Sequence, residues 1–247
     1  MRYLILSDMH SNWEAFQAVL RRARRKTFGA YLVLGDLVGY GGAPNQVVDA
    51  VLDLPRRVYA VRGNHDKVVA EIDSGESFNE AALEAARWTG DQLTERNFRY
   101  VRELPEGPRP VADGVAICHG SPLDEDAYVF SDFDAYSIFS ATSTRVTFFG
   151  HTHVPSMFKL QDGGIEVRLL RGRTGRIVLD PEARYLINPG SIGQPRDRDS
   201  RASYMTYDGD RGVVRWYRLR YPIRRAQKRI HQAGLPVVLA ERLAIGI

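Results

Sequence analysis

The chain has 247 residues, of which 44% are apolar and 26% charged, and its formal net charge is +4. This length and apolar content allow a large buried core, and no shift in composition marks a linker, so we expect a single domain over residues 1–247. No apolar run is long enough to span a bilayer, and the first residues become acidic at Asp8, too early for a signal peptide. We therefore expect a cytoplasmic protein with no membrane segment.

The positive charge would attract anionic partners, although solvated arginines on the outer faces of helices and strands are the stronger interpretation of it. Most of the positive excess is arginine, clustered at residues 21–26, 168–176 and 215–229. Such a surface attracts anionic substrates, whereas a nucleic-acid partner is not favoured because no tract of interleaved aromatic residues is present. The single cysteine, Cys118, excludes an internal disulfide and a thiolate metal cage, and we expect it to be a buried strand thiol.

Three short apolar segments early in the chain each end in a polar turn. They are Tyr3 to Leu6, Ala30 to Leu34 and Val58 to Val61. Helical patterns follow the first two, one beginning directly after His10 and the other at Pro44. Repeated strand and helix units predict a parallel sheet with right-handed crossovers.

Two helices are predicted after the third strand. Residues 80–93 and 94–104 have helical patterns, and neither carries a cluster of metal-ligand residues, so these helices should cover the site or a sheet face. Two capping boxes are expected, one from Ser77 with Glu80 and one from Ser11 with Glu14 at the first helix of the chain.

The rest of the chain returns to strands. Two buried strands, Val115 to Cys118 and Val146 to Phe149, flank a loop at 121–132 and a helix near 133–141. Hairpin-like connections after them predict antiparallel pairing in a second sheet packed on the first, made of residues 157–160, 166–170, 176–179, 184–187, 203–207 and 213–218. The tail, about 223–247, is predicted to be helical.

Histidines gather where the predicted core strands end. Of six in the chain, five come just past such a strand: His10, His65, His119, His151 and His153. Ligand sites in open α/β sheets form at the carboxyl ends of strands. The sorting of the histidines therefore predicts one shared site.

Oxygen ligands accompany these histidines. Asp8 lies two residues before His10, so an extended backbone would project both side chains to the same side, and Asp36 follows the second strand. A mixed oxygen and nitrogen set of this size is too large for one tetrahedral ion. Two metals are expected, roughly 3.5–4 Å apart across a bridging carboxylate.

The third strand delivers three polar residues in a row, Asn64, His65 and Asp66. Gly63 precedes them, and its missing Cβ would let the backbone turn sharply there. The three side chains could then point different ways into one crevice. One would bind a metal, the next would donate a proton, and the third would orient it.

The whole motif series resembles that of the calcineurin-like metallophosphoesterases. In the order and spacing of that family, the chain contains Asp8-Met9-His10, Gly35-Asp36, Gly63-Asn64-His65-Asp66, His119 and Gly150-His151-Thr152-His153. A later stretch, Asn188-Pro189-Gly190-Ser191 to Arg196, is similar to the small bacterial and archaeal phosphodiesterase subgroup.

This resemblance implies a fold and a set of ligands. The fold would be α+β, a four-layer α/β/β/α sandwich with two packed mixed β-sheets, the metallo-dependent phosphatase fold. Manganese is the expected metal, with iron, zinc, cobalt and nickel as alternatives. One ion would be held by Asp8, His10 and His153, the other by Asn64, His119 and His151, and Asp36 would bridge them.

The implied activity is hydrolysis of a phosphodiester or a phosphomonoester, with a small phosphate ester or nucleotide as substrate. A metal-activated water would attack phosphorus in line, His65 would assist the leaving group, and Asp66 would orient the His65 ring. Arg196, Arg198 and Arg201 are left outside the predicted site, because such arginines are usually solvated or ion-paired.

Two alternatives remain open from the sequence. A nuclease or RNA phosphodiesterase is favoured by the basic charge and disfavoured by the absence of an aromatic stacking tract. A binding scaffold that has lost hydrolysis would keep the fold, but such relatives usually lack one or more histidines, and His65 is present. The oligomeric state is not predicted.

Overall fold

Two six-stranded β-sheets form the centre of the computed structural model, which describes residues 1–247. In the first sheet, three neighbouring parallel strands are extended on one side by three antiparallel ones. The order of this sheet is β3 (Arg57–Ala60), β2 (Ala30–Val33), β1 (Arg2–Leu6), β11 (Ala202–Asp208), β12 (Val213–Leu219) and β9 (Thr174–Val178).

The second sheet is also mixed. Strands β5, β6 and β10 are parallel to one another, and antiparallel strands extend both edges. The order of this sheet is β4 (Arg109–Ala112), β5 (Val115–Ile117), β6 (Val146–Phe148), β10 (Arg184–Asn188), β7 (Ser156–Gln161) and β8 (Gly164–Leu169).

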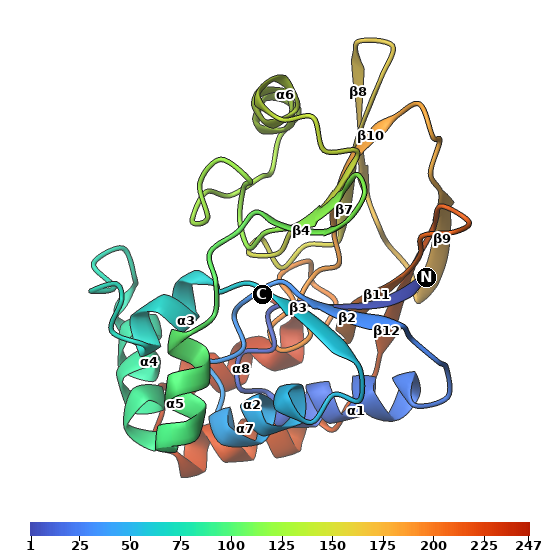
Figure 1. Cartoon of the computed structure of the whole chain (residues 1–247). Helices are drawn as coiled ribbons and strands as arrows, with labels where there is room; N and C mark the ends of the chain where they lie inside the picture. The colour runs from blue at the N-terminus through green and yellow to red at the C-terminus, as the bar shows by residue number, and fades with distance from the viewer.

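Helices cover the outer faces of both sheets (Figure 1). One group lies along the first sheet and consists of α1 (Trp13–Ala23), α2 (Pro44–Leu52), α7 (Ile223–Gln232) and α8 (Val237–Ile245), with α3 (Asn64–Val69), α4 (Glu80–Gln92) and α5 (Glu95–Arg102) beside them. A single helix, α6 (Asp132–Ala141), lies over β7 and β8 of the second sheet. The predicted four-layer α/β/β/α sandwich is confirmed. None of these helices is both long enough and apolar enough to cross a bilayer.

The side chains of β1 point alternately to the two faces of the first sheet, and this shows how the layers are held together. Leu4 and Leu6 point into a core of 34 buried residues shared with the helices, whereas Tyr3 and Ile5 point into a core of 20 buried residues between the sheets. A strand buried on both faces is typical of parallel sheets covered on each side. Cys118 is fully buried under α6, as expected.

The predicted division of strands between the sheets is wrong in one respect. The later strands β9, β11 and β12 join the first sheet, and the earlier strands β5 and β6 belong to the second. Each sheet therefore combines strands from both parts of the chain. Hydrophobic periodicity identifies a strand but does not specify its hydrogen-bonding partner, so the pattern could not reveal this exchange.

Local details also differ from the prediction. The first helix is capped by Asn12, which accepts a hydrogen bond from the Ala15 N–H, and α4 is capped by Asn79. Asparagine caps helices as well as serine does, so the residue nearer to each helix is the cap in place of Ser11 or Ser77. The short elements α3 and β4 were not predicted, because each offers too few residues for a periodic pattern.

Replacing a ring between the sheets tests the core. Phe148 is fully buried between them and packs near Tyr207, with ring centroids 5.4 Å apart. We expect Phe148→Ala to lower the free energy of unfolding by about 3–5 kcal/mol, measured by urea denaturation. Val178, 64% exposed on edge strand β9, is the control, and Val178→Ala should change stability by less than about 0.5 kcal/mol. Equal losses in the two variants would contradict this assignment of the core.

Candidate functional site

All seven predicted ligands lie at the carboxyl ends of strands. Three strands come from the first sheet and two from the second, so the ends of strands from both packed sheets converge at this point. The ligands are Asp8 and His10 after β1, Asp36 after β2, Asn64 after β3, His119 after β5, and His151 and His153 after β6. Every one except Asn64 is buried.

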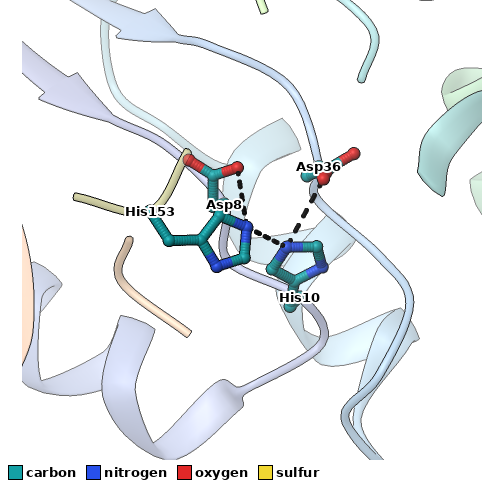
Figure 2. A group of neighbouring side chains, drawn as sticks. All are labelled: Asp8, His10, Asp36 and His153. Atoms are coloured by element: carbon teal, nitrogen blue, oxygen red, sulfur yellow. Dashed lines mark hydrogen bonds and ion pairs between the residues drawn. The ribbon is translucent and has the colours of Figure 1, made fainter. Parts of the chain in front are cut away.

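The side chains form two groups that share one carboxylate. Asp8, His10, Asp36 and His153 make the first group, in which all ligand atoms lie within 4.8 Å of one another (Figure 2). Asp36, His119 and His151 make the second group by the same measure. Asp36 Oδ2 is 3.4 Å from His10 Nε2 and 3.5 Å from His119 Nε2, so one oxygen lies between the two groups.

Backbone carbonyls fix the imidazoles of the first group. His10 Nδ1 is 3.1 Å from the Val38 carbonyl oxygen, and His153 Nδ1 is 2.5 Å from the Gln194 carbonyl oxygen. A carbonyl only accepts, so each Nδ1 must carry the proton. The inner Nε2 atoms of these two neutral rings are then bare acceptors, and they face each other at 3.1 Å.

The second group repeats this arrangement with different carbonyls. His119 Nδ1 donates to the Leu34 carbonyl at 2.7 Å, and His151 Nε2 donates to the Asp126 carbonyl at 3.0 Å. The inner nitrogens, His119 Nε2 and His151 Nδ1, lie 3.1 Å apart. Asn64 Oδ1 is 3.2 Å from the same His119 nitrogen and adds an oxygen donor.

Facing lone pairs repel unless a cation lies between them. Nitrogen ligands on one ion with bonds of about 2.0–2.1 Å are separated by roughly 3.0–3.4 Å, which matches both pairs. Metal-bound histidines usually donate their outer N–H to a carbonyl or carboxylate, as here. The residues present therefore fit a divalent cation in each group.

The electrostatics agree with this fit. Burial raises the pKa of Asp36, but the surrounding His119, His65 and His10 outweigh that effect and hold the pKa well below its usual range. Burial lowers the pKa of His119, yet the nearby Asp36 raises it to about 10. The negative charge of Asp36 therefore favours a positive charge beside it.

Backbone strain is concentrated in the ligand loops. Five of the ligands have positive φ: Asp8 at 53°, His10 at 47°, Asp36 at 51°, His151 at 67° and His153 at 59°. Side chains other than glycine rarely adopt this region, and such strain typically gathers at functional sites. The predicted extended backbone through Asp8 and His10 is therefore wrong, because each loop turns sharply at its ligands.

Gly63 has a role different from the predicted turn. Its φ of −109° is open to any residue, but a Cβ at this position would collide with the carboxylate of Asp36. The missing side chain allows β3 to approach Asp36 closely enough for the His65 backbone N–H to bond its Oδ1 at 2.9 Å. The glycine is needed for this close approach.

His65 lies beside the metal groups in an aromatic surround. Its ring centroid is 4.3 Å from that of Tyr40, 4.4 Å from that of Phe78 and 4.9 Å from that of His10. Its Nδ1 is buried without a hydrogen-bond partner. Burial lowers the pKa of His65 to about 4, more than the nearby Asp36 raises it.

The expected contact between Asp66 and the His65 ring is not found. Asp66 Oδ1 accepts hydrogen bonds from the Leu37 and Val38 N–H groups, at 2.9 and 3.3 Å, and Oδ2 accepts one from Gly63 N–H at 3.0 Å. Burial, with Asp36 nearby, raises the pKa of Asp66 to about 7. Successive residues of α3 point in different directions, so Asp66 instead anchors the loop that follows Asp36.

Arg196, which we left outside the predicted site, lines the same pocket as Asp36 and His65. Its guanidinium forms no ion pair, unlike Arg201, which pairs with Asp199 at 2.5 Å. It lies 3.3 Å from the Tyr40 hydroxyl, and its buried Nε has no partner. The sequence offered one signal for Arg196, which is its position in the turn that begins at Asn188. That turn contacts the ligand loops.

Two side chains of that turn connect it to the site. Asn188 Nδ2 donates to the Gly150 carbonyl at 2.6 Å, and Ser191 Oγ donates to the Asp8 carbonyl at 2.9 Å. The loops after β1 and β6 are thus connected by the last residue of β10 and the turn that follows it. These two hydrogen bonds help to fix the loops that carry the ligands of the first group.

Comparisons with known proteins agree with this geometry. A metallophosphoesterase from Sphaerobacter thermophilus, of known structure, is 36% identical, with a TM-score of 0.86 over 100% of this chain and 99% of its own. A hypothetical protein from Pyrococcus horikoshii OT3 shares the fold at 19% identity, with a TM-score of 0.82 over 100% and 98% of the two chains. An uncharacterized protein of Methanocaldococcus jannaschii is 34% identical over 246 residues, which cover 98% of this chain and 97% of its own.

The family comparison gives the same result from sequence. Residues 1–212 match the calcineurin-like phosphoesterase superfamily domain, and this range contains every strand end described above. Only β12 and the two C-terminal helices lie outside it. The fold, the ligand groups and the matched sequence together assign this chain to the calcineurin-like phosphoesterase superfamily.

Proposed function

We propose that this protein hydrolyses a phosphomonoester or phosphodiester with the help of two divalent cations. Manganese is the expected metal, and iron, zinc, cobalt and nickel are the alternatives. The observation that carries the proposal is the pair of facing imidazole nitrogens in each ligand group, with every outer nitrogen already bonded to a backbone carbonyl. Such nitrogens are bare ligands oriented for a metal.

Each ion would have its own ligands and one shared carboxylate. Asp8, His10 and His153 would hold one ion, Asn64, His119 and His151 the other, and Asp36 would contribute to both. When bound, two such ions supply a water of lowered pKa as nucleophile and neutralise charge on the phosphoryl oxygens.

The protein side chains around the metals orient the substrate and handle a proton. Arg196 is an unpaired cation in the pocket and would bind a phosphoryl oxygen, while Tyr40 steadies its guanidinium. His65 would stabilise or protonate the leaving oxygen. The Tyr40 and Phe78 rings enclose His65 and keep water from its buried face.

The proposal extends to the location, the substrate type and the domain organisation of the protein. We propose a cytoplasmic enzyme acting on a small phosphate ester or a nucleotide, with residues 1–247 working as one domain. In support of one domain, α7 and α8 pack on each other and α7 packs against α1, so the tail is continuous with the first helical layer.

A substrate panel tests the activity itself. Protein freed of metal by chelation should be inactive, and added Mn²⁺ should restore hydrolysis of at least one ester. The panel compares an aryl monoester, an aryl diester, a cyclic nucleotide, a dinucleoside polyphosphate and single-stranded RNA. Full activity of the metal-free protein, or none with any metal, would reject the proposal.

Asp36→Asn tests the shared carboxylate. Because its oxygen lies between both groups, the substitution should reduce bound metal and activity together, at least tenfold in metal affinity. Metal content is measured by mass spectrometry after dialysis, and activity is measured on the best substrate of the panel. Asp49→Asn on α2 makes the same change outside the site, and it should leave both quantities unchanged. Unaltered metal content in Asp36→Asn would refute the shared role.

His65→Ala separates proton transfer from metal binding. We expect metal content to stay normal while turnover of an alkyl ester falls by about 10²–10⁴-fold, the usual contribution of general acid–base catalysis. An ester of 4-nitrophenol, whose leaving group needs no proton, should be affected far less.

The control is His231→Ala, which removes an exposed histidine on α7 outside the site. This variant should hydrolyse both esters at the wild-type rate. Equal losses on both esters in His65→Ala would show that the ring positions the substrate and does not supply a proton.

A further inference from the structure

The pocket beside the metals extends well beyond the ligands. It has a volume of about 250 Å³ and runs from Asp36, His65 and His153 toward the loop between α3 and α4. That loop contributes four side chains to the wall of the pocket: Asp73, Ser77, Phe78 and Asn79. The set combines one aromatic ring with hydroxyl, amide and carboxylate groups.

The loop lies on the side of the pocket where the leaving group would depart. Phe78 packs on the His65 ring at 4.4 Å, and His65 is the residue placed to serve the leaving oxygen. A group released toward His65 therefore meets the α3–α4 loop. On another wall Tyr128, 46% exposed, stacks on His151 with ring centroids 3.9 Å apart and adds a second aromatic surface.

Carboxylates outnumber the lysine and arginine side chains in the wall of this pocket. Arg196 is the one cationic lysine or arginine side chain in its wall, against three carboxylates. Asp36 belongs to the metal groups, and Asp126 is paired with Lys67 at 2.5 Å. Asp73 is exposed and has no cationic partner, so its negative charge is uncompensated.

The Asp73 carboxylate also has a fixed orientation. Its Oδ1 accepts a hydrogen bond from the Gly75 N–H at 2.8 Å, and Gly75 has a positive φ of 75°. The turn thus holds the charge at the pocket wall. The Oδ2 atom is left to face a ligand hydroxyl or to repel an anion.

The basic residues of the chain gather elsewhere. A groove of about 520 Å³ at the amino-terminal end of β1 is lined by Arg2, Lys26, Arg176, Arg211 and Arg215. The metal ligands follow the other end of β1. The positive net charge therefore does not reach the leaving-group side of the pocket.

We propose that the pocket selects esters that carry one phosphate on an otherwise uncharged leaving group, and that Asp73 rejects leaving groups bearing further negative charge. This proposal rests on the phosphoesterase function proposed above. Two bound metals and Arg196 would bind a single phosphoryl group, and a second phosphate on the side of the α3–α4 loop would face the unpaired Asp73. Nucleoside polyphosphates and nucleic-acid strands are then disfavoured.

The side chains also define the kind of group accepted. Phe78 and Tyr128 offer ring faces, while Ser77, Asn79 and Asp73 offer hydrogen-bonding groups for hydroxyls. A ring with attached hydroxyls, such as a nucleoside or a substituted phenol, fits this combination. The substrate class is a single-phosphate ester of an uncharged, hydroxylated aromatic or nucleoside group.

Two related substrates vary the charge of the leaving group, and comparing their rate ratio between variants cancels the difference in leaving-group acidity. The phosphate ester of 4-hydroxybenzoate and that of its methyl ester are similar in size and differ by one negative charge on the leaving group. We expect kcat/KM of the wild-type protein with Mn²⁺ to be about tenfold higher for the phosphate of methyl 4-hydroxybenzoate than for the phosphate of 4-hydroxybenzoate. This ratio corresponds to one like-charge contact partly screened by water. This preference should weaken as salt is added.

Three variants then locate the cause. Asp73→Asn keeps a side-chain oxygen for the Gly75 N–H and should remove most of the preference, and Asp73→Lys should invert it. Glu76→Lys makes the same charge change in the same loop at a residue that does not line the pocket, and it should leave the ratio within about twofold.

The outcomes are distinct. A wild-type protein that hydrolyses both esters equally would overturn the proposal, as would equal effects of Glu76→Lys and Asp73→Lys. Retention of the wild-type ratio by Asp73→Asn would also overturn it, even if Asp73→Lys misfolds. Absence of hydrolysis of both esters with every metal would remove the phosphoesterase function itself, and is recognised by the failure of the whole substrate panel.

Discussion

The site depends on the hydrogen bonds that its imidazoles give to backbone carbonyls. Four rings each donate an outer N–H to a carbonyl of a neighbouring loop, which fixes both the tautomer and the direction of the inner nitrogen. A histidine without such a partner could rotate and protonate on either nitrogen. With these partners, two pairs of inner nitrogens are directed at common points, where a proton or a cation offsets the repulsion of their lone pairs.

The ligand loops are also strained. Ligands such as Asp36 and His151 have left-handed backbone conformations that cost free energy, of order 1–3 kcal/mol each. Rigid strands of both sheets flank these loops, and the fully buried cores above and below them compensate for the cost. The sandwich is therefore the support that allows a tightly turned set of ligands to exist.

Much of this arrangement could be predicted from the sequence. Buried strands followed by histidines and aspartates revealed where the ligands would converge, because parallel strands present their carboxyl ends at one edge. The assignment of strands to sheets could not be predicted. The patterns of β5 and β11 identify both as strands, and only their long-range hydrogen bonds decide which sheet each joins.

Other errors have local causes. A tripeptide such as Asn64, His65 and Asp66 shows which side chains are present, but its placement in the first turn of a helix decides where they point. Asp66 therefore binds backbone N–H groups in place of the His65 ring. Arg196 was missed because the exposure and pairing of an arginine depend on tertiary neighbours that no short pattern contains.

The metal-ligand residues and the α3–α4 loop of the pocket wall differ in how much substitution they tolerate. The ligands are buried, strained and tied to carbonyls, so almost any substitution there disturbs several contacts at once. Asp73 and Ser77 lie on an exposed loop, where a side chain can change without moving the ligand groups. In the proposed function the fixed ligands would support hydrolysis, and this loop would select among esters.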